Sequence, residues 1–174
     1  MVNFGDAALN MTRGWLEEFA LKWPARVGLP FACNININYL NEQDIIHLKQ
    51  AGCVSVQFGL EAGSEKVRLE IYKKGYTDEI VYSIPKLLRK HKITYRTNNI
   101  MGSPAETLED MFETARVNKR IQPNGCTVLI YRPFRSTVLG QEDFRLGRVD
   151  EERNIGPSIQ NDSMMKRSDL REVV

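Results

Sequence analysis

Two periodicities alternate along this chain. Five runs rich in β-branched and apolar residues lie at 2–9, 31–38, 54–60, 93–101 and 127–134, and the segments between them carry apolar residues at helical spacing. A helix between two strands returns the chain to the same edge of a sheet, which favours parallel strands with right-handed crossovers. The pattern predicts an α/β fold, either an open doubly wound sheet or part of a (β/α) barrel, and periodicity alone does not choose between them.

Polar residues indicate where the expected helices begin. Thr12 and Ser64 are candidate N-cap residues, each followed by a helical pattern. Pro85 lies inside the pattern at 78–91, where a missing backbone donor predicts a bent or divided helix. Capping boxes are expected at two pairs: Asn41 with Asp44, and Thr107 with Asp110.

Composition excludes some classes of protein and partner. The chain has 174 residues, of which 42% are hydrophobic, and its formal net charge is +2. Lysine and arginine are scattered, so no nucleic acid or anionic membrane is indicated as a partner. No apolar run approaches the roughly 18 residues that a membrane-spanning helix requires. Residues 1–140 are expected to form the folded domain, and the polar segment 141–174 is expected to be a tail.

The three cysteines do not form a recognisable framework. Cys33, Cys53 and Cys126 are odd in number and far apart in the sequence, which argues against disulfides and suits the reducing cytoplasm. The simplest interpretation is that all three are small buried hydrophobic residues at strand starts. A three-cysteine metal site assembled by the fold is the alternative.

Polar or glycine residues end several of the expected strands. In parallel α/β folds ligands gather at the carboxyl ends of the strands. Turn formation and helix capping explain each such residue by itself, but they do not require Glu61 at the end of an apolar strand or Arg96 inside one. A buried carboxylate or guanidinium needs a partner, which a ligand could provide. The strand-end residues are Gly5 and Asp6, Asn36, Glu61 and Ser64, Asn98 to Glu106, and Arg132 with Pro133.

The order of these motifs resembles the radical S-adenosylmethionine (SAM) superfamily. The series is FGDAAL, CNININ, AGCVSVQFGLEAGSE, KKGYT, NNIMGSPAETLED and IYRPFRST, over roughly residues 1–140. It resembles the barrel, from its second strand to its sixth, of the group that often carries a cobalamin-binding domain. The resemblance implies about five βα units of a partial (β/α)6 barrel, truncated before the second barrel strand. It also implies reductive SAM cleavage by a four-iron four-sulfur cluster to a 5′-deoxyadenosyl radical, with cobalamin in members that carry that domain.

The resemblance assigns SAM contacts position by position. It places Gly5 and Asp6 near the methionine amino group, Glu61 and Ser64 near the ribose and methionine moieties, and Lys74 near the methionine carboxylate. Ile100 and Gly102 are expected near the adenine, where Glu106 braces their loop. Further expected contacts are Asn36, Arg96, Asn98, Tyr131 and Pro133. No catalytic residue and no metal ligand is assigned, and the substrate and reaction type stay unknown.

Three departures from the family pattern qualify this interpretation. Lys74 stands where relatives have arginine, Ala105 replaces a glycine, and no CxxxCxxC motif occurs to hold the cluster. This chain alone is therefore expected to be inactive. Alternatives are a cluster-less ligand-binding or scaffold protein, or half of a split enzyme whose N-terminal chain bears the cluster. An unrelated hydrolase or dinucleotide-dependent enzyme lacks support, because GxGxxG, P-loop and GxSxG motifs are absent.

Overall fold

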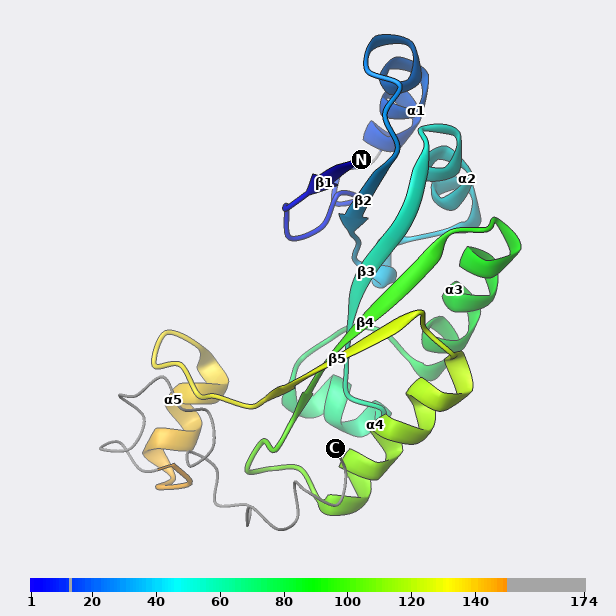
Figure 1. Cartoon of the computed structure of the whole chain (residues 1–174). Helices are drawn as coiled ribbons and strands as arrows, with labels where there is room; N and C mark the ends of the chain where they lie inside the picture. Colours follow the sequence, from blue (N-terminus) through cyan, green and yellow to red (C-terminus); the bar gives the residue numbers. More distant parts are fainter. Residues whose placement is uncertain (13, 150–174) are drawn as a thin grey trace. The chain divides into compact units, whose positions relative to one another are not determined.

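The computed structural model describes residues 1–12 and 14–149, which form one five-stranded sheet with helices (Figure 1). The strand order is β1-β2-β3-β4-β5, and β2 is parallel to both β1 and β3. The predicted α/β fold with sequentially adjacent parallel strands is confirmed. The elements are β1 (Val2–Phe4), α1 (Trp15–Arg26), β2 (Phe31–Asn34), the 3₁₀ helix η1 (Ile37–Tyr39), α2 (Glu42–Gln50), β3 (Cys53–Glu61), the π-helix η2 (Val67–Ile71), α3 (Asp78–Lys90), β4 (Thr94–Met101), α4 (Leu108–Ile121), β5 (Gly125–Ile130) and α5 (Val138–Arg145).

The chain divides into two compact units, and the division cuts through three strands. Unit 1 comprises Met1–Leu60, Gly75–Asn98 and Lys119–Thr127. Unit 2 comprises Glu61–Lys74, Asn99–Asn118 and the described residues from Val128 onward. Strands β3, β4 and β5 therefore begin in unit 1 and end in unit 2.

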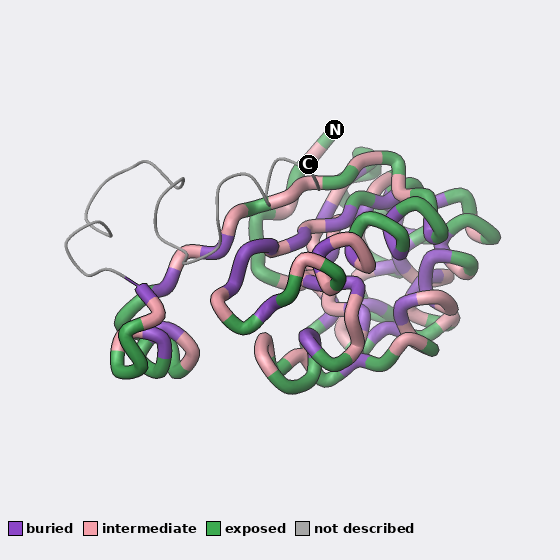
Figure 2. The backbone as a smooth tube through the Cα atoms, turned by 90° about the horizontal axis from the view of Figure 1, so that it is seen from below, coloured by how far each residue is buried: buried purple, intermediate pink, exposed green. Residues whose placement is uncertain are grey.

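In unit 1 helices cover one face of the sheet. Helix α1 packs against α2, and α2 packs against α3. Burial alternates along the strands (Figure 2). Cys33, Phe58 and Tyr95 are buried, whereas the residues immediately before and after each of them in its strand are half-buried or exposed. An aromatic cluster joins α1 to the edge of the sheet, with ring centroids 5.1 to 5.8 Å apart among Phe4, Phe19, Trp23 and Phe31.

Strand β2 is shorter than the alternation of residues 31–38 predicts. It ends at Asn34, and Asn36 begins the 3₁₀ helix η1. The Asn36 side-chain oxygen accepts a hydrogen bond from the backbone N–H of Asn38 at 3.0 Å, which turns the chain out of the extended conformation. Asparagine competes locally with strand pairing in this way, and the apolar alternation does not reveal it.

The start of α1 differs from the prediction, and at Pro85 the structure excludes a divided helix, while the bend stays a prediction. Gly14, in the left-handed conformation with φ 77°, is the N-cap of α1, so Thr12 lies outside the helix. Helix α3 continues through Pro85 without division. One backbone hydrogen bond is lost there, and burial of Ile84, Pro85 and Leu88 offsets the loss. The Asn41–Asp44 capping box is confirmed.

The expected boundary at residue 140 falls inside helix α5. Gly140 and Asp143 are buried, so the first residues of the expected polar tail belong to a packed helix. Residues 150–174 lie outside the described residues. Within residues 1–12 and 14–149, no helix combines the length and the apolar character required to cross a membrane.

Candidate functional site

In unit 1 the loop after β1 is held by two asparagines at the end of β2. The Asn34 side chain donates to the Asp6 carbonyl at 2.8 Å, and the Asn34 carbonyl accepts from Leu9 N–H at 2.8 Å. Asn10 and Asn36 exchange two further hydrogen bonds of 2.8 Å between side chain and backbone. Four hydrogen bonds thus fix the loop that carries Gly5 and Asp6.

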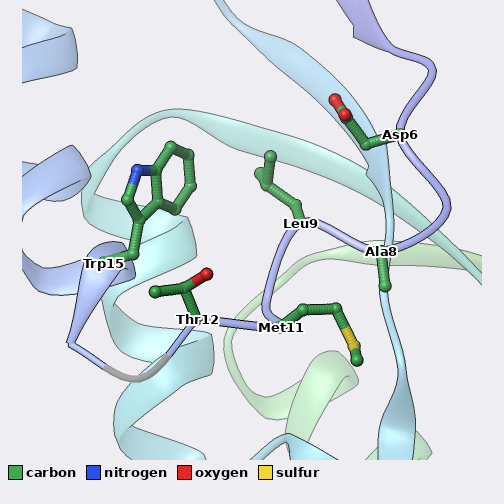
Figure 3. A pocket seen from close by; sticks show the side chains of 6 residues that line it. All are labelled: Asp6, Ala8, Leu9, Met11, Thr12 and Trp15. Carbon is green, nitrogen blue, oxygen red and sulfur yellow. The ribbon is translucent and has the colours of Figure 1, made fainter.

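A pocket of about 210 Å³ opens beside this loop. Figure 3 shows the Asp6 carboxylate and the Trp15 indole at its two sides, with Leu9 between them. Trp15 stacks on Phe19 with ring centroids 4.7 Å apart, which fixes the indole. Ala8, Met11 and Thr12 complete the lining. The exposed Asp6 carboxylate at the rim of this pocket suits a ligand that presents an amino group.

In unit 2 the end of β3 has a strained backbone and an ion pair. Glu61 has a φ of 63°, a left-handed conformation that costs a non-glycine residue about 1–3 kcal/mol. Its side chain is 15% exposed and lies 3.0 Å from the Lys74 ammonium. Such strain typically persists at ligand-binding positions, where the surrounding structure imposes it. Glu61 and Lys74 were both predicted from the sequence, and the structure brings them together.

The turn that follows Glu61 is built on a buried arginine. Arg68 is fully buried, and its Nη1 donates to the Ala62 carbonyl at 2.9 Å and to the Gly63 carbonyl at 2.7 Å. Gly63 N–H donates to the Thr114 hydroxyl at 2.7 Å. Burial of Arg68 is not evident from the sequence, because this residue lies among the alternating charges of EKVRLEIYKK, a pattern typical of a solvated helix.

Ser64 has a structural position in this turn. Its hydroxyl oxygen accepts from Val67 N–H at 3.4 Å. The predicted capping role of Ser64 is confirmed, although the segment it precedes is a π-helix. Since π-helical turns occur frequently at functional sites, this turn is consistent with a ligand-binding edge.

Tyr72 and Glu106 form the buried centre of unit 2. Glu106 is 5% exposed, and its Oε2 accepts from the Tyr72 hydroxyl at 3.0 Å and from Ser103 N–H at 2.9 Å. Burial raises the pKa of Glu106 to about 7, although both hydrogen bonds oppose the rise. The pKa of Tyr72 is also raised, by burial and by the nearby groups Glu106, Tyr131 and Glu61. Tyr72, which the sequence analysis did not single out, therefore lies near three candidate site residues.

The loop after β4 accommodates its departure from the family pattern. Gly102 has a φ of 85°, which glycine adopts without strain. Ala105 is not among the residues with positive φ, so alanine fits the position where relatives have glycine. The Glu106 carboxylate, bonded to Ser103 N–H, closes this loop as the resemblance implied.

We expect the free energy of unfolding to fall as pH rises through about 7, by on the order of 1–3 kcal/mol, because of Glu106. Its pKa rises from 4.5 to about 7 on folding, so the folded state binds the proton more tightly than the unfolded state. The stabilisation is complete below about pH 4.5 and is lost between there and about pH 7. Urea titrations at several pH values measure the dependence.

The contribution of Glu106 to stability is the difference in the free energy of unfolding between the parent protein and the Glu106→Gln variant. This difference should change with pH over the stated window, because glutamine does not titrate. Glu109→Gln is the matched control, since Glu109 lies three residues later, in the first turn of α4, with its side chain 77% exposed. A difference for Glu106→Gln that is constant with pH would contradict the assignment.

At the end of β5, Tyr131 is fixed at both ends. Its backbone N–H donates to the Met101 carbonyl at 2.7 Å, and its hydroxyl donates to the buried Asp143 carboxylate at 2.7 Å. This contact joins α5 to the end of the strand. Pro133 is buried two residues later, and Ile100 is half-buried in β4.

Three predicted site residues have other positions or contacts. Asn36 uses its side-chain oxygen to begin η1. Arg96 is the third residue of β4, near the amino end of the strand. Its side chain lies against Gly125, where an added Cβ would lie 3.0 Å from the Arg96 Nε. Asn98 accepts a hydrogen bond from the Gln57 side chain at 2.8 Å within the sheet. The SAM contacts of these three residues stay predictions.

The cysteines do not fit an iron–sulfur cluster. Cys33 and Cys53 are buried in neighbouring strands, and the hydrogen bond between their thiols, together with burial, raises the pKa of Cys33. Cys126 is exposed in β5, so the expectation that all three are buried is wrong for this residue. Residues 1–12 and 14–149 contain no group of three or more His, Cys, Asp or Glu arranged to hold a metal ion.

Comparison with known families identifies the chain. The profile described as "Radical SAM superfamily" matches residues 10–117. The chain belongs to the radical SAM superfamily. In this family fold, the carboxyl strand ends described above are the ends of barrel strands, as the resemblance implied.

Curated relatives are similar over part of their length. An uncharacterized methyltransferase of Pyrococcus horikoshii is 27% identical over 111 residues, which are 64% of this chain and 24% of that protein. A tRNA-2-methylthio-N(6)-dimethylallyladenosine synthase of Moorella thermoacetica is 33% identical over 87 residues, 49% of this chain and 19% of that enzyme. The radical SAM chain thus spans about a quarter or less of these relatives.

Solved structures share the radical SAM fold. The methyltransferase TsrM from Kitasatospora setae, with tryptophan substrate and a SAM analog bound, gives a TM-score of 0.72 at 21% identity, covering 83% of this chain and 29% of TsrM. A second TsrM structure, with cobalamin and a [4Fe-4S] cluster, gives a TM-score of 0.65 at 21% identity over 75% of this chain and 27% of TsrM. At this identity the likeness establishes the partial barrel fold.

Proposed function

We propose that this chain forms the SAM-binding part of a radical SAM enzyme. In such an enzyme one electron from a [4Fe–4S] cluster cleaves SAM to methionine and a 5′-deoxyadenosyl radical. The observation that carries the proposal is the Glu61–Lys74 ion pair, which lies at the end of β3 with Glu61 in a left-handed conformation. A carboxylate there can accept hydrogen bonds from ribose hydroxyls, and an ammonium can bind the methionine carboxylate.

Each unit contributes residues that follow the carboxyl ends of strands. In unit 1 Gly5 and Asp6 are assigned to the methionine amino group, and the pocket between Asp6 and Trp15 supports that assignment. In unit 2 the proposed contacts are Glu61, Ser64, Lys74, Ile100, Gly102, Tyr131 and Pro133. Tyr72 and Glu106 position the loops between them through their hydrogen bond.

Glu61→Gln is expected to weaken SAM binding by about tenfold, because it removes a charged acceptor worth about 1.5 kcal/mol. Lys74→Met should have a similar effect. Isothermal titration of the chain with millimolar SAM measures the dissociation constant. Lys90→Met is the matched control, since Lys90 pairs with Glu42 on the surface of unit 1 and should leave binding unchanged. Equal dissociation constants for Glu61→Gln and the parent chain would overturn the assignment.

We further propose that the cluster ligands come from outside this sequence, either from a preceding segment or from a separate chain. Fusion to a CxxxCxxC-bearing strand and loop, followed by anaerobic reconstitution, should produce 5′-deoxyadenosine from SAM. Adding the same segment as a separate polypeptide distinguishes a split enzyme from a continuous one. Absence of product with a spectroscopically verified cluster would favour a ligand-binding or scaffold role.

We make two additional proposals, on cobalamin dependence and on cellular location. TsrM binds cobalamin, and the full-length protein containing this chain is proposed to do so as well. A cytoplasmic location is proposed from the odd number and wide sequence spacing of the three cysteines, which suit a reducing compartment.

A further inference from the structure

A row of carboxamide side chains crosses the sheet of unit 1 on the face opposite its helices. Asn34 of β2 is paired in register with Gln57 of β3. The Gln57 Nε2 donates to Asn98 Oδ1 of β4 at 2.8 Å. All three residues are half-buried, whereas their neighbours along the strands, such as Cys33 and Phe58, are buried toward the helices. Three carboxamides from three adjacent strands thus lie in one line.

Sheet stability does not explain this row. Asparagine is depleted in strands, where β-branched residues such as threonine and valine are favoured by up to about 1 kcal/mol. Asn34 and Asn98 both lie within strands. The residues that flank Gln57 on the same face, Ser55 and Gly59, are small. The face therefore combines unfavourable strand residues with small neighbouring residues, as a ligand-contacting surface would.

The hydrogen bonds already made leave a complementary pair of atoms. Asn34 donates its amide to the Asp6 carbonyl, and Gln57 donates to Asn98. In the part of the chain that the structure describes, Gln57 Oε1 and Asn98 Nδ2 have no hydrogen-bond partner, and neither atom is sealed from solvent. The two hydrogen-bonded side chains thus leave one acceptor, on Gln57, and one donor, on Asn98, on a half-buried surface.

We propose that Gln57 and Asn98 bind a neutral substrate group that presents a donor and an acceptor side by side, namely a carboxamide or the amino-azine edge of a nucleobase. Such a group donates its N–H to Gln57 Oε1 and accepts from Asn98 Nδ2, which satisfies both atoms. This inference names a substrate class and so rests on the proposed enzymatic function. The site lies within unit 1 and requires neither SAM nor a cluster for binding.

Nicotinamide and 3-acetylpyridine test the proposal, because they differ only in an amino group replaced by a methyl group. Titration of the 15N-labelled chain with nicotinamide should shift the side-chain amide resonances of Gln57 and Asn98. 3-Acetylpyridine, which lacks the donor, should bind roughly 5- to 50-fold more weakly, since a hydrogen bond is lost and an acceptor is left unsatisfied. Equal affinity for the two compounds would overturn the proposal. So would the absence of any shift of these resonances at the highest soluble concentration of nicotinamide.

Two variants separate binding from folding. Asn98→Thr should reduce nicotinamide affinity by about tenfold while the melting temperature is unchanged or raised, because threonine is the better strand residue. Gln43→Leu is the control, since Gln43 lies on helix α2 and bonds only His47 among the described residues. Unchanged nicotinamide affinity in folded Asn98→Thr would contradict the inference. If the parent chain binds nicotinamide but not SAM, the proposed SAM site is wrong and the carboxamide site is still supported.

Discussion

Gly63→Ala is expected to lower the free energy of unfolding by about 3 kcal/mol or more. A Cβ at Gly63 would lie 2.4 Å from the Glu113 carbonyl oxygen and 2.5 Å from Thr114 Cα, and all of these neighbours are backbone atoms of α4. The helix would have to move, which also weakens the 2.7 Å hydrogen bond from Gly63 N–H to the Thr114 hydroxyl. Urea denaturation followed by circular dichroism measures the change.

Gly5→Ala is the matched control for this prediction. An added Cβ at Gly5 meets no atom within 4 Å, and Gly5 does not have a positive φ. Alanine there should change the free energy of unfolding by less than about 0.5 kcal/mol. If both variants unfold at the same urea concentration as the parent, α4 does not pack on the turn at Gly63.

Arg68→Ala is expected to destabilise the protein by about 3–5 kcal/mol. The guanidinium is fully buried, and its loss leaves the Ala62 and Gly63 carbonyls without their donor and opens a cavity. Arg68→Met restores part of the volume but not the donors, so it should recover part of the loss. The free energies come from the same urea titrations.

Arg116→Ala supplies the comparison for a surface arginine. Arg116 is half-exposed and pairs with Glu109 and Glu113 on α4. Exposed ion pairs contribute little, so this variant should lose less than about 1 kcal/mol. A loss for Arg68→Ala as small as that for Arg116→Ala would show that the guanidinium is not buried in solution.

If Gly63 and Arg68 have these effects, the GLEAGSE segment is a structural unit as well as a candidate binding motif. Arg68 holds the turn, Gly63 allows α4 to approach, and Glu61 is left strained with its carboxylate facing Lys74. Changes at Gly63 would then alter SAM binding through the turn. Effects on binding should therefore be interpreted only for variants whose unfolding curves match the parent.

Local sequence patterns correctly predicted most of the secondary structure. The presence of five strands and the Asn41 capping box depend on residues within a few positions of one another, and the structure confirms both, although β1 and β2 are shorter than the predicted runs. The Thr107 and Asp110 pair also forms the reciprocal hydrogen bonds of a capping box. Side-chain periodicity and capping act over one or two turns of chain, so sequence alone suffices for them.

The sequence also determined the family, because the motifs occur in a fixed order along the chain. Only the tertiary structure showed that Arg68 is buried, that Tyr72 reaches Glu106, and that Gln57 bonds Asn98. The partners in the last two contacts are 34 and 41 residues apart in the sequence. Such contacts arise when packed helices and strands bring distant segments together, and a charged or polar residue has the same local pattern whether it faces water or a buried carbonyl.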